Sequence, residues 1–215
     1  MDSGYTTPLV IQHEGRAALL TWGAQDLTLH EAADGRQLRN CGDFNPAGTA
    51  LWPAVGTPLV AEGIAVVGFG RGDRGIPRLH GIRLGGDGDV TATNREWMRE
   101  DVGAFVPSPA EYEGKVYVLS DRGQVDCLDP KTGRTLWSGS LPRSSSNYYA
   151  SPMIAGGVMY MAREAGAVFV ARVENGFTPL SETEFDDRVI ASVVPAGDHV
   201  LVRGKANLYC LTALE

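Results

Sequence analysis

The fold is decided by one stretch near the middle of the chain: Cys127-Leu128-Asp129-Pro130-Lys131-Thr132-Gly133-Arg134-Thr135-Leu136-Trp137. A Lys-Thr-Gly turn separates two short, largely apolar runs, and this pattern is typical of two strands joined by a reversal. We therefore predict strands at residues 124–128 and 135–140.

Two further strands are expected just before this pair, at residues 109–112 and 115–120. Turn residues Glu113-Gly114 and Asp121-Arg122-Gly123 separate them. No segment of the chain shows a sustained helical period. Four short strands in succession predict an antiparallel meander.

The meander recurs along the chain. Ser108-Pro109 and Ser151-Pro152 are 43 residues apart, as are Gly133 and Gly176. Earlier copies open at Thr7-Pro8 and Thr57-Pro58, and a partial copy opens at Ala191-Ser192. The repeat units are approximately 7–56, 57–107, 108–150, 151–190 and 191–215. A repeated four-stranded meander predicts an all-β propeller of four-stranded antiparallel blades, here a partial propeller of about five units and 19 strands.

The stretch of residues 127–137 closely resembles the Ala-x-Asp-x-x-Thr-Gly-x-x-x-Trp motif of the pyrroloquinoline-quinone-like propeller repeat. In that family the Thr-Gly turn joins two strands and the Trp docks against the neighbouring blade, so the resemblance implies this role for Trp137. The place of the Trp is taken by Arg39 in the first copy, Trp97 in the second and Leu180 in the fourth. Relatives of this type include quinone-dependent dehydrogenases and the propeller lipoprotein of the outer-membrane barrel-assembly machinery.

Composition excludes several functions. The net charge of −7 argues against tracking nucleic-acid phosphates, which requires a basic surface. No apolar run is long enough to span a bilayer, and the first residues show no signal peptide. The resemblance alone suggests a periplasmic or extracytoplasmic location.

Catalytic signatures are weak. The dehydrogenases of the family place a disulfide of adjacent cysteines over their cofactor, whereas Cys41, Cys127 and Cys210 are far apart. Cys127 and Cys210 occupy the same repeat position, where we expect a small, core-facing residue. We therefore expect no enzyme activity, no cofactor and no metal.

Other motifs have simpler interpretations. Residues 70–75 fit G-x-G-x-x-G, but a strand follows them and not the helix that a dinucleotide loop needs. Residues 85–89 carry Asp87 and Asp89 but lack the further carboxylates and the closing Glu of a calcium loop, so they predict a polar hairpin turn. His13, His30, His80 and His199 are isolated, so surface or satisfied structural roles are expected. Asp186-Asp187 predicts a solvated turn.

One topological inference points to a binding face. In a meander blade, the loops between second and third strands share a face with the connections between blades. Exposed aromatic and arginine side chains there would favour binding, although the aromatics could instead pack the blade edges. The residues expected on this face are Trp52, Arg71, Arg74, Phe105, Arg143, Asn147, Tyr148 and Tyr149.

The sequence thus predicts a non-catalytic scaffold that binds a protein, peptide or glycan partner. Two alternatives stay open: a fragment of a quinone-dependent oxidoreductase whose active residues lie outside this chain, and an outer-membrane protein assembly factor. Only Asp2–Thr6 offers a strand to complete the last copy. It is short and a poor strand former, so we expect an open arc that self-associates through its end blades.

Overall fold

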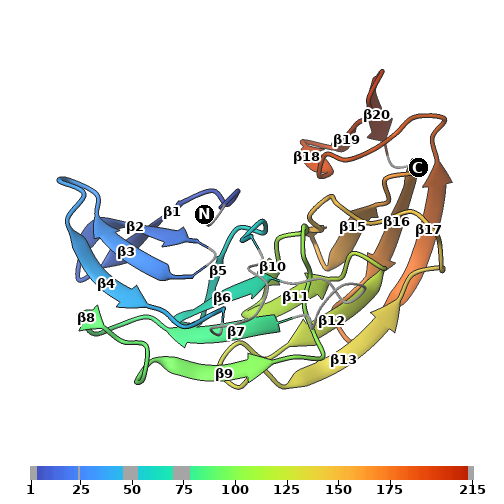
Figure 1. Cartoon of the computed structure of the whole chain (residues 1–215). Coiled ribbons are helices and arrows are strands. Elements are labelled where there is room, and N and C mark those ends of the chain that lie inside the picture. The colour runs from blue at the N-terminus through green and yellow to red at the C-terminus, as the bar shows by residue number, and fades with distance from the viewer. Residues whose placement is uncertain (1–3, 24, 46–52, 70–77, 213–215) are drawn as a thin grey trace. The chain divides into compact units, whose positions relative to one another are not determined.

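The computed structural model describes residues 4–23, 25–45, 53–69 and 78–212. The predicted Gly-rich motif at residues 70–75 lies outside this part of the chain. The described residues form twenty strands and no helix (Figure 1). They divide into two compact units, residues 1–105 with 129–134 (unit 1) and residues 106–128 with 135–215 (unit 2).

The strands of unit 1 form two sheets. Blade 1 has the order β1-β2-β3-β4 with the short β8 beside β4, and blade 2 has the order β5-β6-β7-β9. The strands are β1 (Leu9–His13), β2 (Arg16–Trp22), β3 (Leu27–Glu31), β4 (Gln37–Cys41), β5 (Leu59–Ala61), β6 (Ile64–Phe69), β7 (Arg78–Arg83), β8 (Gly88–Asp89) and β9 (Arg95–Arg99). The predicted hairpin turn at residues 85–89 thus contains a strand, which pairs in parallel with β4.

Unit 2 holds three sheets, β10 to β13 (blade 3), β14 to β17 (blade 4) and the three-stranded β18 to β20 (blade 5). The strands are β10 (Ala110–Tyr112), β11 (Lys115–Leu119), β12 (Gln124–Leu128), β13 (Thr135–Ser140), β14 (Met153–Ala155), β15 (Val158–Ala162), β16 (Ala167–Arg172), β17 (Thr178–Glu184), β18 (Val194–Ala196), β19 (His199–Arg203) and β20 (Leu208–Thr212). All pair antiparallel in sequence order, which confirms the predicted meander.

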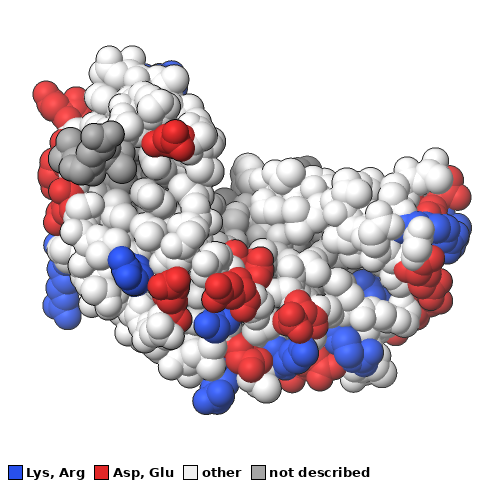
Figure 2. Space-filling view, turned by 180° about the vertical axis from the view of Figure 1, so that it is seen from behind, with Lys and Arg blue, Asp and Glu red and all other residues white. Residues whose placement is uncertain are grey.

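Local sequence explains the hairpins. The first and second strands of blades 1, 2 and 3 are joined by Glu14-Gly15, Glu62-Gly63 and Glu113-Gly114, in which both residues have positive φ. Such two-residue turns twist in the sense that antiparallel strands require. In blade 3, the side chains of the two middle strands, β11 and β12, are almost wholly buried, whereas those of β13 alternate between half-buried and exposed. Figure 2 shows acidic and basic side chains interspersed on the face that it draws.

The core lies between sheets of the same unit. In unit 2, one face of blade 3, with Tyr117 and Cys127, packs on Met159 and Phe169 of blade 4. The other face of blade 4 packs on blade 5 through residues such as Val202. A sheet with both faces buried explains the continuous apolar runs of its middle strands.

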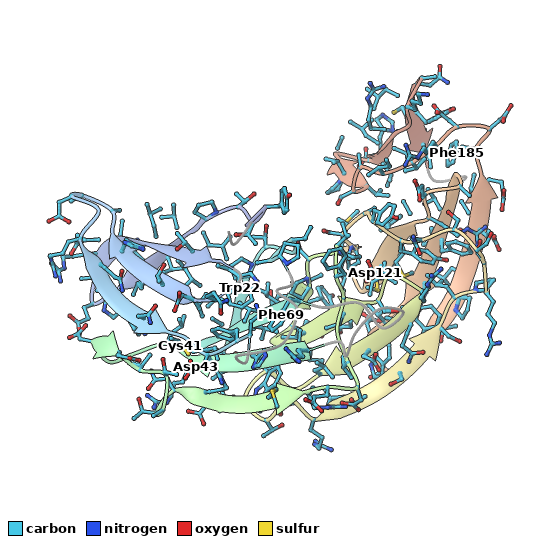
Figure 3. The ribbon with its side chains drawn as sticks, in the orientation of Figure 1. Trp22, Cys41, Asp43, Phe69, Asp121 and Phe185 are labelled. Atoms are coloured by element: carbon cyan, nitrogen blue, oxygen red, sulfur yellow. The ribbon has the colours of Figure 1, made fainter. Side chains whose placement is uncertain are left out.

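An aromatic cluster fills the core of unit 1. Trp22 contacts Phe44 edge-to-face, with 4.6 Å between ring centroids. The ring of Trp22 also lies 5.8 Å from that of Phe69, and Figure 3 labels both of these side chains. His80 stacks on Phe69 with 5.7 Å between centroids and is 1% exposed. Burial lowers the pKa of His80 to about 3, and the positive charges of Arg95 and Arg78 add to the effect. His80 is therefore a neutral core residue at physiological pH.

In blade 1, Arg39 occupies the position on the fourth strand that tryptophan holds in the repeat motif. Arg39 pairs with Leu29 of the third strand, is 3% exposed and donates from Nη1 to the carbonyl of Gly85 at 2.9 Å. Trp97 of blade 2 similarly donates from Nε1 to the carbonyl of Pro130 at 2.8 Å. In both cases, a side chain of the fourth strand bonds to a turn that joins the third and fourth strands of another sheet.

Trp137 itself is half-buried. Its ring lies 5.8 Å from that of Tyr117 and 6.4 Å from that of Phe177, between centroids. Phe177 follows the turn that precedes β17 of blade 4, so the indole contacts the neighbouring blade, as the resemblance implied.

Cysteine burial differs from the prediction at one position. Cys127 is buried in blade 3 as expected, but Cys210 at the matching position of blade 5 is exposed. The reason is that Cys210 lies on the side of β20 opposite to Tyr209 and Leu211, which pack against blade 4.

Candidate functional site

Loops of blades 3, 4 and 5 meet on one side of unit 2, which we term the loop face. Three are hairpin loops between second and third strands, and two are connections between blades. The segments are residues 120–123, 141–152, 163–166, 185–193 and 204–207. They agree with the topological prediction that these two kinds of loop share a face.

Backbone hydrogen bonds join each connection between blades to the neighbouring hairpin loops, and the same pattern recurs from blade to blade. The amide of Tyr148 donates to the carbonyl of Asp121 at 3.0 Å, and that of Val189 donates to the carbonyl of Glu164 at 3.1 Å. The amides of Glu164 and Lys205 donate in turn to the carbonyls of Asn147 (2.9 Å) and Arg188 (2.8 Å). These bonds fix the loops as a preformed surface, which lowers the entropy cost of binding.

A first cavity of about 470 Å³ opens on the loop face. Its lining residues are Ser146, Glu164, Ala165, Phe185, Asp186, Asp187 and Arg188. Arg188 crosses from the connection to the hairpin loop and donates from Nε to Glu164 Oε1 at 2.8 Å. Ser146 accepts a hydrogen bond at its Oγ from the amide of Ala165 at 3.0 Å. The walls of this cavity are therefore polar and held in place.

A second cavity of about 460 Å³ shares Arg188 with the first. It is lined by Arg188, Ile190, Ala191, Arg203, Gly204 and Lys205. Three of these six residues carry positive charge in a chain whose net charge is −7. Ile190, 46% exposed, adds an apolar contact. Cations beside an apolar side chain suit an acidic segment that also carries an apolar residue.

Asp187 organises the rim between the two cavities. Its carboxylate accepts hydrogen bonds from the amides of Ala206 (3.1 Å) and Asn207 (3.0 Å) and from the hydroxyl of Tyr209 (3.3 Å). Burial alone would raise the pKa of Asp187, but the hydrogen bonds from Ala206 and Asn207 lower it below its usual value. The sequence predicted only a solvated turn at Asp186-Asp187. In the structure, the Asp187 carboxylate fixes the loop between β19 and β20 by these hydrogen bonds.

The residues predicted for the binding face divide into four groups. Trp52, Arg71 and Arg74 lie outside the described residues, and Phe105 belongs to unit 1. Arg143, Asn147 and Tyr149 lie in the loop between β13 and β14, on the loop face, with Arg143 exposed and the other two half-buried. Asn147 donates to the hydroxyl of Tyr149 at 2.8 Å.

Tyr148 lies in the core and not on the surface. It is 1% exposed and its ring is 6.0 Å from that of Phe169, between centroids. Burial raises the pKa of its hydroxyl. Its side chain therefore anchors the connection that displays Asn147 and Tyr149.

Sequence reasoning missed Glu164, Asp187, Arg188, Arg203 and Lys205. One signal could have found two of them: Arg188 and Lys205 each lie 41 residues after a residue of the preceding repeat, Asn147 and Glu164. In both pairs the later residue's amide donates to the carbonyl of the earlier one.

The described residues offer neither a cluster of metal ligands nor a membrane-spanning helix. Among the described residues, no group of three His, Cys, Asp or Glu side chains could hold a metal ion. Cys41 and Cys127 are free and buried, and burial raises the pKa of both thiols. Within the same part of the chain, no helix has the length and apolarity to cross a bilayer.

The sheets, the repeated turns and the docked fourth-strand side chains define the class of protein: a β-propeller of pyrroloquinoline-quinone-like repeats. A family profile described as outer membrane protein assembly factor BamB matches residues 43–178, well over half of the chain. The chain belongs to this family.

Known proteins agree with this assignment of fold. The structure of BamB from Moraxella catarrhalis superposes with a TM-score of 0.72 at 13% identity, over 98% of this chain and 58% of that one. Quinohemoprotein alcohol dehydrogenase ADHIIG from Pseudomonas putida HK5 superposes with a TM-score of 0.65 at 15% identity, over 98% of this chain and 40% of that one. At such identities the likeness shows the fold alone.

A curated relative is similar in sequence. Tetrathionate hydrolase from Acidianus ambivalens is 29% identical over 146 residues, which cover 58% of this chain and 27% of that protein. The chain therefore spans about a quarter of the length of this relative.

Proposed function

We propose that the chain is a non-catalytic propeller scaffold that binds a protein partner through the loop face of unit 2. The observation that carries this proposal is the pair of cavities that share Arg188, set in loops already tied together by backbone hydrogen bonds. Arginine and aromatic residues on a preformed surface are the usual anchors of protein interfaces.

A protein or peptide partner suits the surface better than a glycan does. The second cavity combines the charges of Arg188, Arg203 and Lys205 with the exposed Ile190. Arg188 is already paired with Glu164, so an acidic segment with one apolar side chain would pair with Arg203 and Lys205 and cover the isoleucine. Tyr149 and Arg143 extend the surface at its other end.

The family suggests where this scaffold acts. Its description, an outer membrane protein assembly factor, supports a periplasmic or extracytoplasmic location in a bacterium and a role in assembling outer-membrane proteins. The partner would then be another component of the cell envelope.

An enzymatic role is the second candidate, because the hydrolase of Acidianus ambivalens is similar over more than half of this chain. Two assays on the natural protein test it: tetrathionate hydrolysis, and dye-linked alcohol or sugar oxidation after reconstitution with the quinone and calcium. Turnover in either assay would replace the scaffold proposal.

Site-specific photo-crosslinking in living cells tests the scaffold proposal. A photoreactive residue at Asn147 or Tyr149 should crosslink one envelope protein. The matched control is Leu136 on β13, which is 38% exposed but lies outside the loop face. Crosslinks of equal yield and identity from the control position would contradict the proposal.

A further inference from the structure

A third cavity, of about 500 Å³, lies between blades 3 and 4. Both blades have all four strands within unit 2, and Figure 1 draws their fourth strands, β13 and β17, in yellow and orange. Residues 140–142 form the cavity wall on blade 3, and residues of β16 and β17 form most of the wall on blade 4. The cavity shares no lining residue with the two cavities of the loop face. Its volume is typical of ligand pockets, which measure about 300–1,000 Å³.

The sequence of β13 explains why the two blades leave a hollow. Trp137 and Gly139 are half-buried and lie on the same side of the strand, since side chains alternate along it. The indole of Trp137 fills the space toward Phe177, with 6.4 Å between ring centroids. Gly139 has no side chain, and Phe177 occupies part of the space that it leaves, because a Cβ at Gly139 would overlap the ring. Ala171 on the blade 4 wall is also small, so room remains between the sheets.

Apolar side chains form most of the cavity wall. Leu141, Phe169 and Ala171 are buried and form its inner part. At its opening, Leu180 is 48% exposed and Phe177 is half-buried. Leu180 is the extra residue of a β-bulge in β17, and a bulge of this kind re-aims a side chain. The cavity can therefore receive an apolar side chain that enters from the surface.

The charge of the cavity is negative. Among the described residues that line it, Glu182 alone is charged, and its side chain is 42% exposed. Arg163 Nη2 lies 3.9 Å from Glu182 Oε1, which is too long for a hydrogen bond. The same nitrogen donates to Glu184 Oε1 at 3.3 Å, and the guanidinium carbon lies 5.1 Å from the ring centroid of Phe169. Arg163 is thus held by Glu184 and Phe169, which leaves the Glu182 carboxylate able to accept from a ligand.

Charge complementarity defines the ligand that suits this cavity. A carboxylate beside an apolar hollow favours an apolar group with a positive charge next to it, and it repels an anion. Ser140 on blade 3 and Ser181 on blade 4 are both exposed and add a hydroxyl to each wall. Hydroxyls both donate and accept hydrogen bonds, so they can pair with the amides and carbonyls of an extended peptide. These features together suit a basic and apolar peptide segment.

We propose that the cavity between blades 3 and 4 binds a short segment of a protein partner, which inserts a phenylalanine or leucine side chain and pairs an adjacent lysine or arginine with Glu182. Burial of the apolar side chain would supply most of the affinity, and the charge pair would select the sequence. This segment is opposite in charge to the acidic segment proposed for the second cavity of the loop face. The two surfaces therefore bind different segments.

An NMR titration of the full chain with the peptide acetyl-Gly-Ser-Phe-Lys-Ser-Gly-amide tests the proposal, because chemical shifts detect even millimolar affinity. We expect saturable shifts at the amides of Leu141, Ala171 and Leu180 with peptide at up to about 5 mM. Replacing the peptide's phenylalanine with serine should weaken binding at least about tenfold, because the apolar contact is lost. Replacing its lysine with glutamate should weaken binding at least about fivefold, because attraction to Glu182 becomes repulsion.

Variants of the chain separate this site from others. Glu182→Gln should remove the preference for lysine over glutamate in the peptide, whereas Glu174→Gln, an exposed glutamate of blade 4 outside the cavity, should retain it. Arg203→Glu with Lys205→Glu should leave peptide binding unchanged, which distinguishes this site from the loop face. Thermal melting confirms that each variant is folded.

Three results would overturn the proposal. The first is the absence of shifts at the cavity amides, and the second is a lysine preference that survives Glu182→Gln. The third is saturable binding of 3-phenylpropylamine at these amides while the peptide produces no shifts, because the occupant would then be a small amine and not a protein segment.

Discussion

The sharpest prediction concerns Gly81, which lies beneath the indole of Trp97. Its φ is not in the left-handed region, so Gly81→Ala introduces no backbone strain, but the new Cβ would meet Cε2, Nε1 and Cζ2 of Trp97 at 2.1, 2.3 and 2.6 Å. The indole must move. Overpacking of this kind costs about 1–3 kcal/mol, and loss of the 2.8 Å bond from Trp97 Nε1 to the carbonyl of Pro130 adds about 0.5–1.5 kcal/mol.

The expected destabilisation of about 2–4 kcal/mol is measured by urea unfolding of the full chain. A double-mutant cycle isolates its cause. In a Trp97→Ala background, Gly81→Ala should change the free energy of unfolding by less than about 0.5 kcal/mol, because the clashing ring is gone. An equal cost in both backgrounds would refute the reasoning.

Three further predictions concern single residues. Trp137→Ala should cost about 2–4 kcal/mol in denaturant unfolding, because the half-buried indole loses its contacts with Tyr117 and Phe177; an unchanged midpoint would show that this packing is unimportant. The folded-state pKa of His80, about 3, lies below its ordinary value of 6.5. Protonation therefore favours the unfolded chain, and this contribution to stability, complete above pH 6.5, should fall by about 1.4 kcal/mol per pH unit as the pH drops toward 3. His80→Phe should remove that slope, and unfolding curves of both proteins at matched pH values check it. Asp187→Ala should speed hydrogen exchange of the Ala206 and Asn207 amides about tenfold, with little change at amides of blade 3.

Much of the fold could be predicted because it depends on local features of the sequence, namely turn residues and the spacing of short strands. All four strands expected around the motif match β10, β11, β12 and β13 to within one residue at each end. Spacing and turn residues suffice for this, since a hairpin depends on neighbours in sequence. The exposure of Cys210 could not be predicted, because it depends on what packs against that side of the strand and not on the residue itself.

The loop face was predicted only in part. Topology correctly grouped the loop of Arg143, Asn147 and Tyr149 with the hairpin loops. It could not indicate that Tyr148 points into the core while its neighbours do not, since that depends on the packing of Phe169. Nor could it identify the cationic cavity, because Arg188, Arg203 and Lys205 come from separate loops that only backbone hydrogen bonds bring together.

The most direct test of the scaffold proposal is the affinity of the crosslinked partner for charge variants of the second cavity, measured by calorimetry. Arg203→Glu with Lys205→Glu should weaken binding at least about tenfold and reduce its salt dependence. Arg172→Glu, an exposed arginine on β16, is the matched control and should leave the affinity unchanged. Equal affinity for the wild type and the cavity variant would contradict the claim that unit 2 binds its partner through the loop face.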